Sequence, residues 1–132
     1  MQMFSSPTLE QLLELNKEHL TLFGMEQNEE KITRLYNHFM SANGCIVLGD
    51  SEKYLAAMVT EHPFLNIVLA MENGFYARDR KGRELVKQYE EWAKEMGATR
   101  TVLTSYLPND VSIYYKRLGY TLLEQSYTKE LV

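Results

Sequence analysis

Glu72 is the residue in this sequence best suited to accept a proton. It is a lone carboxylate in a strand-like stretch whose neighbours, residues 67–71 and 75–77, are apolar or aromatic. A carboxylate that is buried without a partner has a raised pKa, and it then suits a general base that takes a proton from an amine, directly or through water. A solvent-facing carboxylate near the end of a strand is the alternative interpretation.

A cluster of cations follows Glu72, in a turn that leads into the clearest helix of the sequence. The cluster consists of Arg78, Arg80, Lys81 and Arg83. A cation at a helix N-terminus is unfavourable by about 0.3–1 kcal/mol, because that end carries a partial positive charge, unless an anion binds there. Gly82 allows a ligand to approach the backbone closely. The turn therefore predicts a site for a phosphate-bearing ligand, with a solvated basic loop as the alternative.

The helix after this turn is amphipathic and extends from Arg83 towards Gly97. Its apolar residues recur at four-, three- and four-residue steps and form one stripe at helical period. Gly97 is a natural C′ residue, because glycine adopts the left-handed conformation without a steric cost. The stripe consists of Leu85, Tyr89, Trp92 and Met96.

Composition limits the class of protein. With 132 residues, of which 45% are hydrophobic and 24% charged, the chain fits a single domain over residues 1–132. The net charge of −4 argues against general nucleic-acid binding. One cysteine excludes an internal disulfide, and the three histidines share no ligand spacing, so we expect no metal site. We also expect a cytoplasmic protein without a membrane segment, since no apolar run approaches the roughly 18–20 residues of a span.

The remaining segments predict helices and strands on either side of the turn. Strand, helix and strand in succession after residue 67 imply a right-handed crossover and nearly parallel pairing of the two strands. Gly74 marks a bulge or a splay in the first of them. We expect helices at 7–23, 28–42 and 108–119, and strands at 45–48, 54–61, 67–77, 99–105 and 120–131, the last of which completes the sheet.

The turn and its helix resemble the GNAT superfamily of N-acetyltransferases. In that family a strand leads into a turn of the type [R/Q]-x-x-G-x-[G/A] and then into a helix that ends in E-x-x-A-x-x-x-G. Glu90, Ala93 and Gly97 fit this ending, and Gly82 falls on the last glycine of the turn. Arg80 occupies a position where the family usually has another glycine, and Arg78 lies one step from the usual Arg or Gln.

A second motif strengthens the resemblance. The family carries a pattern of the kind N-x-x-A-x-x-x-Y-x-[K/R]-x-G-[F/Y], and residues 115–120, YKRLGY, fit its end. Asn109 lies one residue closer to the tyrosine than usual, and Ser112 replaces the small apolar residue. The two motifs occur in the family's order and together cover about half of the chain.

The resemblance implies an α+β fold with a mixed, mostly antiparallel sheet, flanked by helices and containing a splayed pair of parallel strands. Acetyl-CoA, as co-substrate, would lie in the splay. The segment between the first two helices would lie on the acceptor side, with Met25, Tyr36 and Phe39 either on its wall or simply packed. The implied cofactor-binding residues are Phe75, Tyr76, Ala77, Arg78, Arg80, Lys81, Gly82, Arg83 and Asn109.

The implied activity is direct transfer of an acetyl group to an amine of a small molecule or a protein. Glu72 would act as the general base, and Tyr115 would protonate or hydrogen-bond the departing thiolate, with packing as the alternative role for Tyr115. The competing hypothesis is a GNAT-like domain with weak or no catalysis that acts through protein contacts. Bacteriophages also contain short chains of this pattern, and a homodimer is left open.

Overall fold

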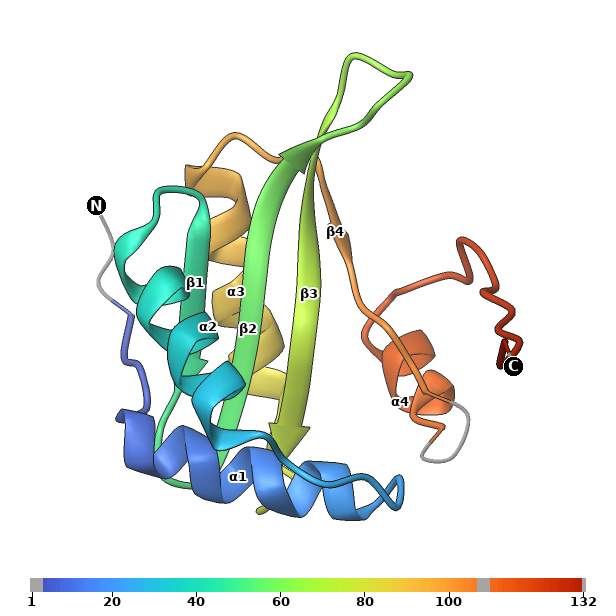
Figure 1. Ribbon diagram of the computed structural model, residues 1–132. Coiled ribbons are helices and arrows are strands. Elements are labelled where there is room, and N and C mark those ends of the chain that lie inside the picture. The colour runs from blue at the N-terminus through green and yellow to red at the C-terminus, as the bar shows by residue number, and fades with distance from the viewer. Residues whose placement is uncertain (1–3, 107–109, 132) are drawn as a thin grey trace.

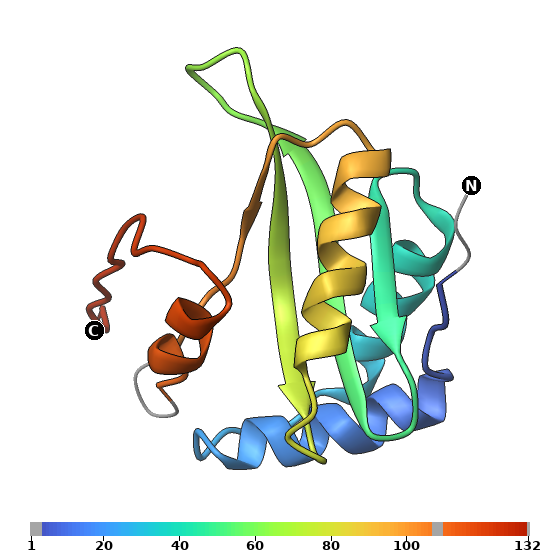
Figure 2. The ribbon, with the colours of Figure 1, turned by 180° about the vertical axis from the view of Figure 1, so that it is seen from behind.

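The computed structural model describes residues 4–106 and 110–131. They form a four-stranded sheet in the order β1-β2-β3-β4, with helices on both faces (Figures 1 and 2). β1 (Cys45–Gly49), β2 (Lys53–Glu61) and β3 (Val68–Ala77) pair antiparallel. β4 (Arg100–Val102) pairs parallel with β3. The predicted mixed and mostly antiparallel sheet is therefore confirmed.

Two helices cover one face of the sheet, α1 (Leu9–Thr21) and α2 (Glu29–Ser41) (Figure 1). α1 begins with a capping box, in which the Thr8 side chain accepts a hydrogen bond from the N–H of Gln11 and the Gln11 side chain accepts one from Thr8. The Asn28 side chain caps α2 by accepting a hydrogen bond from the N–H of Lys31. The buried side chains on this side form one cluster made of Leu12, Leu15, Phe39, Val47, Tyr54 and Ala56.

α3 (Arg83–Glu95) covers the opposite face, as Figure 2 shows. Its apolar stripe is buried as predicted, except that Met96 is the C-cap and is 40% exposed. The fully buried Tyr89 reaches across the sheet, and its hydroxyl lies 2.8 Å from the carbonyl oxygen of Ala70 and 2.9 Å from that of Val102. Tyr89 therefore joins β3 to β4.

β3 and β4 pair only at three positions, from Leu69 with Arg100 to Met71 with Val102. Beyond them the two strands part, which confirms the splayed parallel pair. The register of β2 against β3 also shifts here: Ala56 pairs with Gly74, whereas Ala57 pairs with Glu72, so that one residue of β3 is left over. This bulge lies where Gly74 predicted one. The splay and the bulge meet at Glu72.

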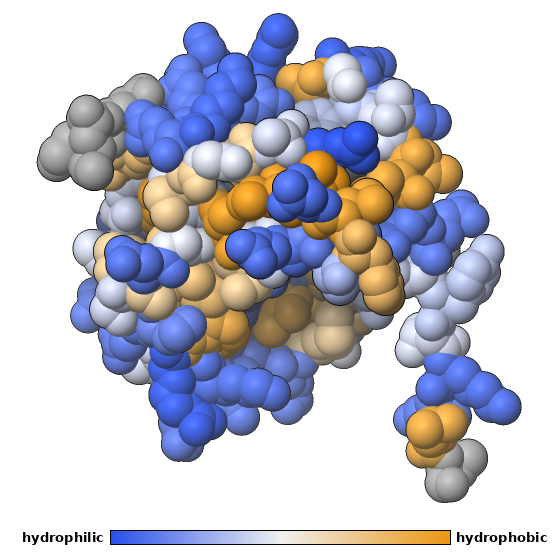
Figure 3. Space-filling model, turned by 90° about the horizontal axis from the view of Figure 1, so that it is seen from above, coloured by the Kyte–Doolittle hydropathy of each residue, from blue (hydrophilic) through white to orange (hydrophobic). Residues whose placement is uncertain are grey.

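The C-terminal part differs from the prediction. α4 (Ser112–Arg117) is shorter than the predicted helix 108–119, whose first two residues lie outside the described residues. The predicted strand 120–131 is wrong, because residues 120–131 form no ladder with the sheet. A strand needs a partner for its backbone hydrogen bonds, and alternation alone does not provide one. In the space-filling view the end of this segment projects from the body (Figure 3).

Within the described residues, no helix has the length and the apolar character that crossing a bilayer requires. Residues 4–106 and 110–131 also contain no group of three or more His, Cys, Asp or Glu side chains that could hold a metal ion.

Candidate active site

Glu72 lies at the vertex where β3 and β4 separate. Its side chain is buried, with 7% of the residue exposed, and its Oε1 accepts two hydrogen bonds from Thr104. The donors are the backbone N–H and the hydroxyl of Thr104, both at 3.1 Å. The carboxylate thus takes the place of the backbone partner that Thr104 would have had if the parallel ladder had continued. The buried interpretation of Glu72 is confirmed, and the solvent-facing alternative is wrong.

The environment of Glu72 brings its proton affinity into the neutral range. Burial raises its pKa to about 7, against the opposing effect of the hydrogen bonds from the backbone and side chain of Thr104. A carboxyl group with this pKa exchanges its proton readily near neutral pH, which is what a general base requires.

Thr104 was not singled out by the sequence. It lies in the predicted strand 99–105, which was expected to pair with the strand that carries Glu72. A hydroxyl residue on that neighbouring strand is the feature of the sequence that could have indicated a partner for Glu72. It also contacts Tyr115, whose hydroxyl donates to the Thr104 carbonyl oxygen at 2.8 Å. Tyr115 is buried, with 7% exposed, and burial raises its pKa. Its one proton is therefore already used within the protein.

The neighbouring Tyr114 is in a different situation. Its hydroxyl is buried and has no hydrogen-bond partner within the described part of the chain. This hydroxyl lies against the start of α3, 3.5 Å from the point where a Cβ on Gly82 would stand. Burial raises the pKa of Tyr114, and the charge of Arg83 opposes that rise. An unpartnered buried donor is costly, so this hydroxyl is available to donate to a group that enters the groove that Tyr114 lines.

The conformation of the turn before α3 shows why Gly82 fits there and how Arg80 can replace the glycine of the GNAT motif. A Cβ on Gly82 would lie 2.6 Å from the tip of the Phe75 ring, so any larger residue here would force that ring or the start of α3 to move. Arg80 has a φ of 59°, the left-handed conformation that glycine adopts without a steric cost. Arg80 therefore occupies a glycine-type position in conformation, although it carries a side chain.

The first turn of α3 is open at its N-terminus. The Arg80 N–H donates to the Ala77 carbonyl at 3.2 Å, and the Lys81 N–H donates to the Asp79 carboxylate at 2.9 Å, so these two amides are used by the turn itself. The N-cap residue is Gly82, which has no side chain that could accept a hydrogen bond from the first N–H groups of α3. The first N–H groups of a helix have no intrahelical partners, and without a capping side chain they can bind an anion.

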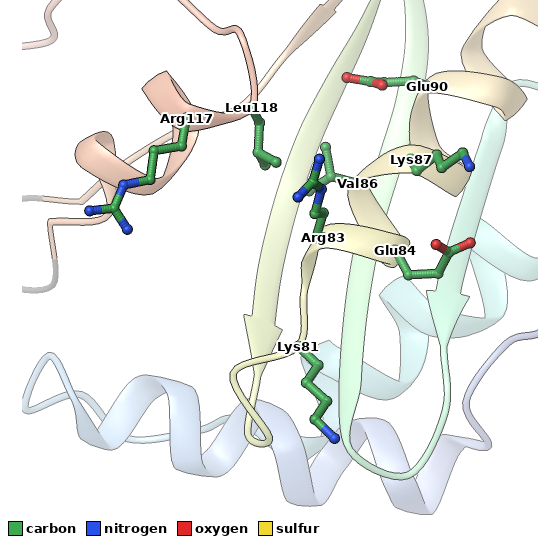
Figure 4. A pocket seen from close by; sticks show the side chains of 8 residues that line it. All are labelled: Lys81, Arg83, Glu84, Val86, Lys87, Glu90, Arg117 and Leu118. Carbon is green, nitrogen blue, oxygen red and sulfur yellow. The ribbon is translucent and has the colours of Figure 1, made fainter.

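The predicted cation cluster is divided in the structure. The Arg78 guanidinium bonds to the carboxylates of Glu14 and Glu18 on α1, which ties β3 to that helix. Arg80 instead lines a groove beside Glu72. Lys81 and Arg83 line a separate cavity of about 760 Å³ between α3 and α4, shown in Figure 4. The other residues of that cavity are Glu84, Val86, Lys87, Glu90, Arg117 and Leu118.

A second cavity, which we call the Glu72 groove, has a volume of about 650 Å³. β3 contributes Glu72 and the predicted residues Phe75, Tyr76 and Ala77, while Gly82 lines its end next to α3. Thr104, Tyr114 and Tyr115 form the opposite side. The groove thus brings most of the predicted site residues together, and Asn109 lies outside the described residues.

The far wall of the Glu72 groove is aromatic. His19 stacks on Tyr76 with ring centroids 5.1 Å apart, Phe23 follows at 5.2 Å from His19, and Tyr106 lies 4.9 Å from Phe23. We call these four residues the aromatic wall. The sequence offered other residues for an acceptor wall, and for two of them the packing alternative is confirmed. Phe39 is in the core, and the Tyr36 hydroxyl donates to the Pro7 carbonyl.

Comparison with solved structures finds similar folds over nearly the whole chain. Glucosamine-6-phosphate N-acetyltransferase from Arabidopsis thaliana superposes with a TM-score of 0.70 at 13% identity, covering 97% of this chain and 97% of that chain. A GNAT family acetyltransferase from Staphylococcus aureus gives 0.65 at 19% identity, covering 93% and 91%. A transcriptional regulator from Bacillus halodurans gives 0.75 at 16% identity, covering 93% of each chain. No protein-family model and no curated protein matches the sequence.

The chain has the GNAT fold. In this chain the fold carries a splayed pair of β3 and β4, an α3 that begins without a capping side chain, and a buried carboxylate where the two strands part. Identities this low establish the fold alone, and one neighbour with this fold carries a regulator's name. The activity must therefore be argued from the site.

Proposed function

We propose that this protein is an acetyl-CoA-dependent N-acetyltransferase that moves the acetyl group directly to the nitrogen of an amine. The observation that carries the proposal is Glu72: a buried carboxylate with a pKa of about 7, at the vertex of the splay and on the wall of a groove. A group with these properties is expected where an amine must lose a proton.

The residues around α3 fit the anionic end of acetyl-CoA. The cavity between α3 and α4 is lined by the cations Lys81, Arg83, Lys87 and Arg117 and by two carboxylates, so that positive charge prevails. It adjoins the first turn of α3, which lacks a capping side chain. Phosphate groups bind well to such a combination of free N–H groups, helix dipole and basic side chains.

When bound, acetyl-CoA supplies an activated acyl group whose carbonyl carbon the amine attacks. Glu72 accepts the proton that the nitrogen loses as the new N–C bond forms, directly or through water. The C–S bond breaks, and the departing sulfur needs a hydrogen-bond donor. Since the Tyr115 hydroxyl already donates to Thr104, Tyr114 is the better donor for this role. No covalent link to the protein is required.

The test has two steps. Acetyl-CoA and free CoA should each raise the melting temperature, because a ligand that binds only the folded state stabilises it. Release of CoA from acetyl-CoA should then depend on an added amine, with the acetylated amine identified by mass spectrometry. If neither nucleotide stabilises the chain, the competing hypothesis of a protein-interaction domain gains support, and a pull-down from cell extract becomes the next step.

A further inference from the structure

Tyr76 is among the cofactor-binding residues that the GNAT resemblance implies, but the other three residues of the aromatic wall have no role in binding acetyl-CoA in the proposal above. They nevertheless form one side of the same groove. The four rings of the wall run in contact from Tyr76 through His19 and Phe23 to Tyr106, with centroid separations of 4.9–5.2 Å. They come from three separate parts of the chain: the C-terminal end of α1 with the turn that follows it, the end of β3 and the segment after β4. Bringing rings from such distant positions to one cavity is typical of a ligand site.

The outer part of this wall is open to solvent. Tyr106 is 55% exposed and Leu22, which lines the groove beside it, is 49% exposed. Apolar surface gathered at the mouth of a groove that also holds a buried carboxylate marks a place where a ligand is desolvated. The ring faces provide apolar area for a flat group and a negative surface for a nearby cation.

The charges in the groove favour an acceptor with one positive charge. Its described charged lining residues are Glu72, Arg78 and Arg80. The Arg78 guanidinium is paired with the carboxylates of Glu14 and Glu18, so its positive charge is more than compensated. Arg80 also lines the groove, and it forms no ion pair within the described residues. A second cation on the acceptor, as in a polyamine, would find no second carboxylate among the described lining residues, and Arg80 would repel it.

His19 does not change this balance. Burial lowers its pKa, and its Nδ1 lies 2.8 Å from the Tyr54 hydroxyl, so at neutral pH the ring is uncharged and held in place. It acts as one more flat, neutral surface. The aromatic wall presents ring faces and not the array of polar side chains that sugar hydroxyls would need.

Resting on the proposed function, we propose that the acceptor is a primary amine whose aromatic ring lies a short carbon chain from the nitrogen. The nitrogen lies at Glu72 and loses its proton there as the N–C bond forms and the thioester C–S bond breaks. The ring lies against Tyr76, Phe23 and Tyr106. The Glu72 groove, at about 650 Å³, falls within the range of about 300–1,000 Å³ typical of small-molecule sites.

The first test compares amines that differ in one feature. Acetylation of phenethylamine, butylamine, spermidine and glucosamine 6-phosphate is measured with the full-length protein and saturating acetyl-CoA. Phenethylamine and butylamine share the amine and differ in the ring, so the ring alone should raise kcat/KM by about tenfold or more. Spermidine should be poorer still because Arg80 repels its extra cations, and glucosamine 6-phosphate because the aromatic wall offers its hydroxyls no array of polar partners.

The second test locates the effect on the wall. Phe23→Leu and Tyr106→Leu should each raise the KM for phenethylamine by about tenfold, with little change for butylamine. Phe64→Leu and Tyr127→Leu are the matched controls, because these residues are 90% exposed elsewhere and should leave both substrates unaffected. The melting shift with acetyl-CoA should be the same in all four variants.

The outcomes separate this inference from the proposed function. If acetyl-CoA binds but butylamine, spermidine or glucosamine 6-phosphate is acetylated as well as phenethylamine, or if no tested amine is acetylated, the aromatic acceptor is wrong and acetyl-CoA binding stands. If acetyl-CoA neither binds nor supports any transfer, the proposed function itself fails, and the inference falls with it.

Discussion

Glu72 has a proton affinity that makes its charge depend on pH in the neutral range. Its pKa is about 7, so the carboxylate that accepts a proton predominates above that pH and is lost below it. We predict that kcat, measured at saturating amine, falls about tenfold per pH unit below about pH 7. The measurement is the pH profile of CoA release between pH 5 and 9, for the unchanged chain and for Glu72→Gln.

Glu72→Gln keeps the shape of the side chain but removes the group that titrates. It should lower kcat by about 10²–10⁴-fold and abolish the fall near pH 7, while the KM for acetyl-CoA stays nearly the same. A variant that retains full kcat, or that retains the same pH profile, would show that another group accepts the proton.

Tyr114 and Tyr115 are adjacent in sequence but differ in what their hydroxyls do. Tyr114→Phe should lower kcat about tenfold with little loss of stability, because its hydroxyl has no partner within residues 4–106 and 110–131. Tyr115→Phe should cost about 1–2 kcal/mol of unfolding free energy, because the Thr104 carbonyl loses its donor, with the smaller effect on kcat. Each variant serves as the control for the other. Kinetics and urea unfolding of both decide the assignment, and the reverse pattern would restore Tyr115 as the donor.

Much of the site was predictable at the scale of single residues, and the reasons for the gaps are physical. Glu72 stood out because a charge within an apolar strand must be explained, and Gly82 because a glycine before a helix permits close approach. Thr104 and the aromatic wall did not stand out, because a threonine in a strand and a phenylalanine near a helix end are ordinary residues. Only the tertiary fold brings them to Glu72, and the sequence does not encode that distance locally.

At the scale of elements, the best predictions rested on independent local signals. α1, α2 and α3 each combine an apolar stripe with a recognisable beginning or end, and all three are confirmed. β4 extends over three residues of the predicted strand 99–105, because the Thr104 amide bonds to a side chain instead of continuing the ladder. The early end of β4 and the burial of the Glu72 carboxylate therefore have the same cause, the hydrogen bond between Glu72 and the Thr104 amide.

The junction between β3 and α3 depends on the absence of one side chain. In Gly82→Ala the new Cβ would lie 2.6 Å from the Phe75 ring, so the ring or the start of α3 must move. We predict a loss of about 1–3 kcal/mol of unfolding free energy, together with weaker stabilisation by acetyl-CoA. The measurement is urea unfolding with and without the ligand.

The double variant Gly82→Ala with Phe75→Leu tests the cause, since the smaller side chain removes the clash. It should be less destabilised than the sum of the two single variants, because the two positions are in contact. Strict additivity would mean that the loss of stability has a cause other than contact with the Phe75 ring.

At the scale of the whole molecule, the structure divides the predicted cluster of cations. The molecule carries a net charge of −4, yet four of the eight residues that line the cavity between α3 and α4 are cations. Lys81 and Arg83 of the predicted cluster are among them, whereas Arg78 and Arg80 line the Glu72 groove. The last segment was predicted as a strand from its alternation. Alternation specifies which residues would share a face of a strand, but not whether a free sheet edge lies within reach.

The C-terminal segment offers a test of how far the folded domain extends. The Tyr120 hydroxyl hydrogen-bonds to Glu90 at 2.9 Å and lies 2.8 Å from the Thr101 hydroxyl, so Tyr120 is joined to α3 and β4. Beyond it, the large side chains of Leu122, Leu123 and Tyr127 are 63–90% exposed and bury little apolar surface. A chain that ends at Tyr120 should therefore keep the melting temperature and the acetyl-CoA shift of the full chain. Tyr120→Phe in the full chain should instead lose about 1–2 kcal/mol of unfolding free energy, because Glu90 and Thr101 lose their partner. If the shortened chain melts at a clearly lower temperature, residues after Tyr120 pack on the domain in solution, and slow amide hydrogen exchange would locate the protected residues within 121–131.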